Sequence, residues 1–184
     1  MGRLFAILVV TAVLVCGQGK PSSSQASNIE LTVYLLSGVA QGETADDVPQ
    51  DLAATVKQLR SVFNYKSYKL SESFMLRGRL GGGAGGASAQ GVLPGGSGIH
   101  YEFRYSSVQT SSETSPLFHI NGLRIVLTNN YYRRGGDGKS VPDPLASIST
   151  DLDIREGQKT VVGKSSINSA GDALILVIVP KLVE

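Results

Sequence analysis

Alternating apolar and polar residues predict that most of this chain forms β-strands. From Ile29 to Leu35 every second residue is apolar and the residues between them are polar, which is typical of a strand with one buried face. Further strand patterns follow in residues 65–76, 88–93, 99–106, 117–128, 148–154 and 160–162.

One segment has the period of an α-helix instead. Its apolar residues recur at spacings of four, four, three and four, so they share one face of a helix. They are Val48, Leu52, Val56, Leu59 and Phe63. We expect the helix to span residues 46–64, with Asp46 or Asp47 as its N-cap and Pro49 in its first turn.

The last third of the chain carries clear turn and strand signals. Glu156-Gly157 stands between two strand patterns and predicts a hairpin turn. Residues 173–179 are apolar at every position, which indicates a strand buried on both faces in the middle of a sheet. Residues 168–172 predict a loop before this strand, and the glycines and prolines of residues 131–144 predict another.

These elements together predict an α+β fold, with one amphipathic helix packed on a mostly antiparallel sheet of about seven to eight strands. A single domain is expected over residues 29–184. Residues 81–98 are rich in Gly, Ala and Ser, so we expect a Gly-rich loop there, ordered as a strand only at residues 88–93.

The first residues predict export. Arg3 precedes a run from residue 4 to residue 16 that is apolar apart from Thr11, which is typical of a signal peptide and too short to span a membrane. Cleavage fits after Gly17 or after Ala26, and we favour Gly17, which gives a signal peptide over residues 1–17 and a flexible linker over residues 18–28. A lipid anchor on Cys16 is disfavoured. Lipoprotein signals require Gly, Ala or Ser directly before the cysteine, and this chain has Val15 there.

Composition narrows the possible partners. Cys16 is the only cysteine, so the mature domain is expected to be stable without a disulfide. The net charge of +2 is small and spread out, which gives no electrostatic basis for binding nucleic acid or an anionic membrane. The chain has no Asn-x-Ser/Thr sequon, which fits a bacterial exported protein slightly better than a eukaryotic one.

Two glycine motifs resemble nucleotide-binding loops, but each lacks a part that nucleotide binding requires. Gly81, Gly83 and Gly86 match G-x-G-x-x-G, but no helix pattern follows to meet a pyrophosphate. The run 138–140 resembles the end of a phosphate-binding loop, but its first glycine is missing and Pro142 follows. No cofactor is therefore expected.

The predicted loop at residues 131–144 begins with the candidate partner-binding residues. An aromatic pair is followed directly by an arginine pair, which could bind an anion or a partner's carboxylates, although a solvated loop is the commoner explanation. The four residues are Tyr131, Tyr132, Arg133 and Arg134.

No pattern of residues predicts an enzyme. His100 and His119 take outward or edge positions in their strands, and two strand histidines could bind a metal only if they met across the sheet. Asp151 and Asp153 face solvent on one strand, where ordinary surface charge explains them. No catalytic residue, metal site or nucleophile is therefore expected.

The C-terminal third resembles the end of the bacterial secretin core. The resemblance rests on Thr150–Gly163, TDLDIREGQKTVVG, and on Ala173–Lys181, ALILVIVPK. In that family a strand, a D/E-G-Q turn and a T-V-V-x-G strand form a hairpin, and an apolar strand ending in Pro-Lys or Pro-Arg closes the unit. Two departures are Lys164, where secretins usually carry a second glycine, and the much greater length of secretin cores.

The front part is similar in fold pattern to the small α/β ring-building modules that precede secretin cores. The resemblance implies an envelope protein that associates with other proteins by sheet edges or by module packing, and it carries over no catalytic residue. We therefore expect a non-enzymatic protein of the periplasm or outer membrane, accessory to secretion or pilus assembly, whose partners are envelope proteins such as a secretin or pilus component.

One alternative comes from a different class. Strands that curl around an apolar pocket could carry a small ligand, with Tyr101, Phe103 and Tyr105 as its lining. An ordinary hydrophobic core explains the same three aromatics more simply, and a hydrolase with an unrecognised site is disfavoured further.

Overall fold

The computed structural model describes residues 28–42, 44–80, 86–94, 98–111, 116–134 and 140–183, with the backbone alone described at 130–134 and 140–143. The expected signal peptide, the linker up to residue 27 and parts of the Gly-rich segment lie outside the described residues. Within the described ranges the chain forms nine strands, one short 3₁₀ helix and one α-helix.

The strands form two sheets in place of the single sheet that was expected. Sheet A has the order β2-β1-β9-β8. In sheet B the central strand is β6, which pairs with β4 and β5 along one side and with β7 along the other. Strand β3 pairs with the outer side of β4. Every pair of strands is antiparallel. The strands of sheet A are β1 (Asn28–Val39), β2 (Ser67–Arg79), β8 (Thr160–Ser166) and β9 (Ala173–Val183). Those of sheet B are β3 (Ala87–Val92), β4 (Ile99–Tyr105), β5 (Ser107–Thr110), β6 (Leu117–Arg134) and β7 (Ser140–Arg155).

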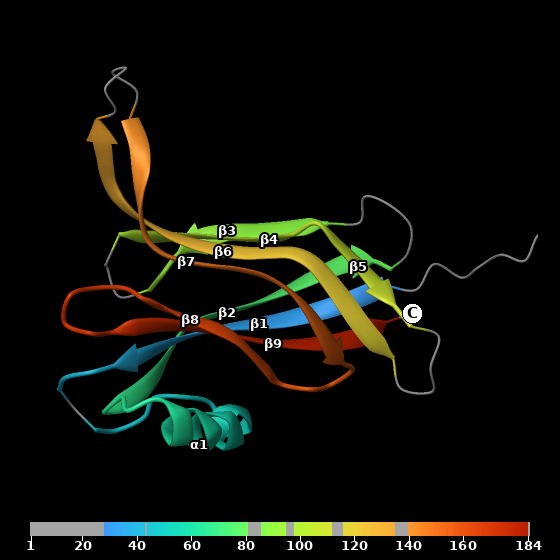
Figure 1. Cartoon of the computed structure of the whole chain (residues 1–184), viewed down its shortest axis with the longest axis horizontal. Helices are drawn as coiled ribbons and strands as arrows, with labels where there is room; N and C mark the ends of the chain where they lie inside the picture. The colour runs from blue at the N-terminus through green and yellow to red at the C-terminus, as the bar shows by residue number, and fades with distance from the viewer. Residues whose placement is uncertain are drawn as a thin grey trace, which may run out of the picture.

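The molecule has three layers, in which sheet A lies between sheet B and the single α-helix (Figure 1). Apolar residues of β1 and β9 point toward sheet B at every second position, and the residues between them on β9 point toward the helix. Residues 174–178 are fully buried as a result. The predicted central position of this strand is confirmed, because β9 pairs with β1 on one side and β8 on the other.

The core between the sheets is made largely of aliphatic and aromatic side chains. Tyr101, Phe103 and Tyr105 of β4 are buried there, and Phe74 of β2 stacks on Tyr101 with ring centroids 5.3 Å apart. The three aromatics therefore contribute to the core, as the simpler interpretation has it. Each buried side chain of this size stabilises the fold by about 1.5–3 kcal/mol relative to exposure.

The helix is shorter than its apolar period predicts. A 3₁₀ turn, η1 (Gln50–Leu52), leads into α1 (Ala53–Val62), and the residue before η1 is Pro49, which provides no side-chain cap. The N-cap prediction is wrong, because Asp46 accepts hydrogen bonds from the backbone N–H of Tyr68 at 2.8 Å and from Arg60 at 2.6 Å. The predicted apolar face is confirmed, since its members pack against sheet A.

Strand β1 differs from its predicted half-exposed state, because both of its faces are covered. Glu30 is only 8% exposed, and a buried carboxylate needs a partner to offset its lost hydration. Arg77 of the neighbouring β2 provides that partner, with its Nε 2.8 Å from Glu30 Oε2.

Two predicted connections are also different. Residues 131–144 were expected to form a loop, but β6 continues to Arg134 and pairs with the start of β7 at Ser140. The turn at Glu156-Gly157 is present, but it does not join a hairpin, because β7 belongs to sheet B and β8 to sheet A.

That turn is a corner between the two sheets. The Glu156 N–H donates to the Pro116 carbonyl beside β6, and the Glu156 carboxylate accepts from the Leu182 N–H of β9 at 2.9 Å. The local sequence fits a tight turn in either case, and only the competition among strands for partners decides which sheet receives β8.

Candidate functional site

The outer face of sheet B is the candidate functional surface. Its inner face supplies the core, so the strict alternation of β3 and β4 sends every second side chain outward to solvent. These outward positions on β4 are occupied by His100, Glu102 and Arg104. The outward positions of β4 are therefore polar or charged.

Four residues form a row straight across this face, which we call the arginine row: Ser88, Arg104, Arg124 and Ser149. Ser88 of β3 is in register with Arg104 of β4, which is in register with Arg124 of β6, which in turn is opposite Ser149 of β7. Residues directly opposite in neighbouring strands have Cβ atoms about 5 Å apart. The two arginines are therefore close neighbours in the middle of the row.

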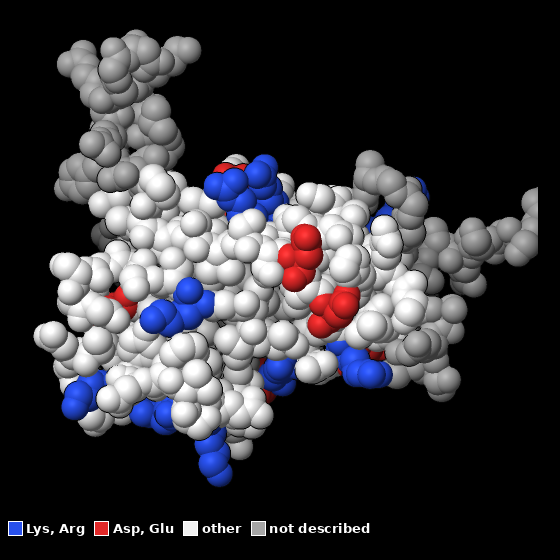
Figure 2. All heavy atoms as spheres, in the orientation of Figure 1, with Lys and Arg blue, Asp and Glu red and all other residues white. Residues whose placement is uncertain are grey.

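Like charges directly opposite one another destabilise a sheet, and neither arginine forms an ion pair with a described acid. The ion pairs among the described residues involve Arg60, Arg77, Lys159 and His119, and neither arginine of the row belongs to them. In Figure 2, Lys and Arg atoms lie over sheet B at the upper edge of the molecule, with acidic atoms beside them.

A shallow hollow of about 540 Å³ opens at the arginine row. Its lining includes both arginines, both serines of the row and the backbone around Ser106 and Gly122. A second hollow of about 310 Å³ lies on the other side of the arginines, beside Glu102 and Thr128. The guanidinium groups thus stand between two spaces that solvent or a ligand can enter.

A β-bulge shapes the edge of the larger hollow. The pairing of β6 with β7 skips between Ile120 and Leu123, and Gly122 adopts φ +62°, which favours glycine. The Gly122 N–H, freed from the ladder by the bulge, donates to Asp151 Oδ1 at 2.6 Å. Asp151 therefore has a structural partner that the surface-charge interpretation did not foresee.

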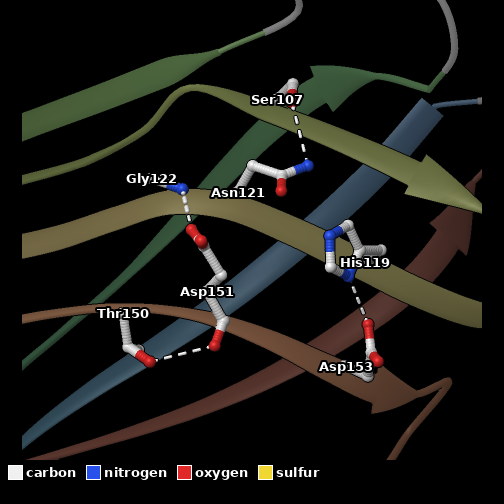
Figure 3. A network of polar contacts seen from close by, with 7 residues as sticks. All are labelled: Ser107, His119, Asn121, Gly122, Thr150, Asp151 and Asp153. Atoms are coloured by element: carbon white, nitrogen blue, oxygen red, sulfur yellow. Dashed lines mark hydrogen bonds and ion pairs between the residues drawn. The ribbon is translucent and has the colours of Figure 1, made fainter.

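Beside the bulge, His119 of β6 pairs with Asp153 of β7 through its Nδ1 (Figure 3). The hydrogen bond to Asp153 raises the pKa of His119, and the slight loss of hydration opposes this weakly. Both side chains are about half exposed, and neither lines the two hollows at the arginine row. The pair is an ion pair across two strands, and a side-chain hydrogen bond with Asn121 also raises the pKa of His119.

The histidines do not come together. His100 is in register with Thr128, whereas His119 lies nine residues earlier on the same strand β6, which separates them by about 30 Å. A metal site shared by these two residues is excluded.

Strand β3 is an exposed edge of sheet B. The Leu93 N–H donates inward to the Ile99 carbonyl at 2.8 Å, so the period of two turns the N–H and C=O groups of Ser88, Gln90 and Val92 outward. No described residue pairs with them. The strand contains neither a proline nor a charged residue, the usual devices that protect an edge from pairing with another chain.

Parts of three other edge strands are covered. In β2 the segment before the helix bonds to the outer side, with the Leu70 N–H donating to the Asp47 carbonyl at 2.8 Å. Edge strands β7 and β8 lie against each other, because the Ser147 N–H donates to Ser165 Oγ and Ile148 packs on Gly163. The final strand β9 is interior.

The predicted partner-binding residues lie on the extension of β6 that pairs with the start of β7. Tyr132, Arg133 and Arg134 take part in this backbone ladder, and Tyr131 lies in the same strand. Their side chains lie outside the described part of the structure, so their role in binding stays a prediction. Sequence patterns did not single out Arg104 and Arg124, because each is an ordinary outward residue until the strand register places them opposite one another.

Comparisons with known proteins add no relatives. No protein-family model matches the chain, and no curated protein matches it. Within the described residues, none of the helices has the length and apolar character needed to cross a membrane.

Proposed function

We propose that this protein is a non-enzymatic interaction module of the bacterial cell envelope, which binds a partner by adding that partner's extended segment to strand β3. The open outer edge of β3 is the observation that carries the proposal. Main-chain hydrogen bonds along such an edge supply affinity, and the alternate side chains supply specificity.

The composition of β3 supports this role. Its residues are small or neutral, so a second strand can approach without meeting a charge or a proline. Gly91 points inward over the ring of Tyr101, where an added Cβ would come within 2.7 Å of the ring, so the strand lies close to β4 and offers a firm template. The outward side chains of Ser88 and Gln90 are exposed and polar.

The cellular setting rests on the sequence. The apolar run after Arg3 predicts export, and the resemblance of residues 150–181 to the end of secretin cores favours a secretin or pilus component as the partner. The periplasm or the periplasmic side of the outer membrane is the corresponding location.

The test compares two substitutions at one position in cross-linked pull-downs from envelope fractions. Gln90→Pro removes an outward N–H without touching the inward hydrogen bonds to β4, whereas Gln90→Ala keeps the donor and removes only the side chain. We expect the wild type and Gln90→Ala to recover the same envelope partner, and Gln90→Pro to lose it.

Two results would overturn the proposal in different ways. Equal recovery by all three proteins would show that the β3 edge is not the contact. Recovery of no partner by the wild type would reject the interaction module itself. Circular dichroism of each variant verifies that the fold is retained.

A further inference from the structure

We propose that the arginine row is a binding site for a compact, doubly charged oxyanion, namely phosphate or the phosphate group of a monoester. This site adjoins the β3 edge at Ser88, but its ligand is a small group of atoms rather than a second protein chain.

The first argument is the uncompensated charge. Arg104 and Arg124 stand opposite one another on the two central strands of the row, and neither is ion-paired within the described part of the chain. Two guanidinium groups about 5 Å apart at Cβ repel each other, and one dianion between them neutralises both. A monocarboxylate would neutralise only one of them.

The second argument is donor geometry. Each guanidinium offers a planar fork of N–H donors that matches two oxygens of a phosphate. Ser88 and Ser149 place hydroxyl groups at the two ends of the row, one beside each arginine. The four side chains line the same hollow, so they supply donors on opposite sides of a central anion.

The third argument concerns what the site rejects. Glu102 lies two residues from Arg104 on β4 and lines the neighbouring hollow, and Asp151 lies two residues from Ser149 on β7. A run of carboxylates from an acidic peptide, extended along the strands, would meet these two acids and be repelled. A compact anion confined to the row keeps its charge between the arginines.

The bulge keeps the Asp151 carboxylate occupied. Its Oδ1 accepts the Gly122 N–H at 2.6 Å, and Gly122 lines the hollow with no side chain of its own. Asp151 is thus turned to a backbone donor and forms no ion pair with Arg124. The bulge thus places a residue without a side chain in the hollow and holds the Asp151 carboxylate on a backbone donor.

The test is a calorimetric titration of the purified protein with inorganic phosphate at low ionic strength and pH 7.5, with chloride at matched ionic strength as the reference. Variants Arg104→Gln and Arg124→Gln each remove one guanidinium group. Arg155→Gln is the matched control, because it makes the same charge change six residues along β7 from Ser149, about 20 Å away.

We expect each row variant to weaken phosphate binding at least about tenfold, as the loss of charge-assisted hydrogen bonds requires. The Arg155→Gln variant should bind within about twofold of the wild type, since only long-range charge is altered. An equal loss of phosphate affinity in all three variants would show that binding depends only on net charge and would overturn the site. Undetectable binding by the wild type would overturn it as well.

Vesicles identify the source of the anion. Phosphatidic acid presents a phosphomonoester, phosphatidylglycerol presents a singly charged diester, and phosphatidylcholine is the neutral reference. Row-dependent binding to phosphatidic acid alone supports the site with a membrane-borne monoester as its ligand. Binding of free phosphate without vesicle binding supports it with a soluble ligand, whereas equal binding to both anionic vesicles would show a general attraction to charge and contradict it.

Discussion

Replacing Gly122 by alanine tests the bulge that shapes the candidate site. Gly122 has φ +62°, where an alanine costs about 1–2 kcal/mol more than glycine. An added Cβ would also lie 2.3 Å from Ser106 Oγ and 3.0 Å from Ser106 Cβ. Such overpacking typically costs a further 1–3 kcal/mol, so we expect Gly122→Ala to lower the free energy of unfolding by about 2–5 kcal/mol.

A matched glycine separates the two contributions. Gly157 has φ +70°, but an added Cβ there meets no atom within 4 Å, so Gly157→Ala carries only the backbone cost of about 1–2 kcal/mol. Urea unfolding at 25 °C gives both values, with an unchanged m-value as the sign of a two-state comparison.

Ser106→Ala provides the third measurement, because it removes the hydroxyl oxygen that the new Cβ would meet. We expect Gly122→Ala to cost less in this background than in the wild type, and a double-mutant cycle gives the difference directly. If Gly122→Ala costs no more than Gly157→Ala, the close approach of Ser106 to the bulge is wrong and the reasoning fails.

Three further predictions concern the charge and packing of sheet B. Arg124→Gln should raise the free energy of unfolding by about 0.2–1 kcal/mol in low salt, because it relieves the opposed arginines, and the gain should shrink at 1 M salt; a loss of stability in urea unfolding would contradict this. Phe103→Ala should lower the free energy of unfolding by about 3–5 kcal/mol, since its fully buried ring fills the space between the sheets, and a cost below 1 kcal/mol would show a loosely packed interior. For His119, NMR titration should give a pKa above the usual histidine value, and Asp153→Asn should lower that pKa. The stabilisation from the His119–Asp153 pair should be complete below the usual histidine pKa and lost as pH rises through the raised pKa. An equal loss of stability for His119→Gln at every pH would therefore contradict the ion pair.

Much of the local structure follows from the sequence. The period of two predicts β1 and β4 within a few residues, and the period near 3.6 predicts the apolar face of α1. These patterns succeed because each strand or helix must bury one face, and burial selects apolar residues at the spacing that the backbone geometry imposes. The unbroken apolar run of β9 likewise indicates a strand covered on both sides.

The tertiary structure decides how the strands divide into two sheets. Glu156-Gly157 has the chemistry of a tight turn, yet the turn passes from sheet B to sheet A and is held by hydrogen bonds to Pro116 and Leu182. A turn signal reports local backbone preference only, whereas pairing depends on every strand that competes for the same edge.

The candidate site has the same origin. Arg104 and Arg124 lie twenty residues apart in the sequence and are unremarkable as outward residues of two strands. The register of β4 on β6 places them opposite each other, and the bulge at Gly122 opens the hollow beside them. The sequence by itself determines which side chains of a strand share a face, because alternation is local, but only the packing and pairing of distant strands determine which face meets solvent and which side chains meet one another.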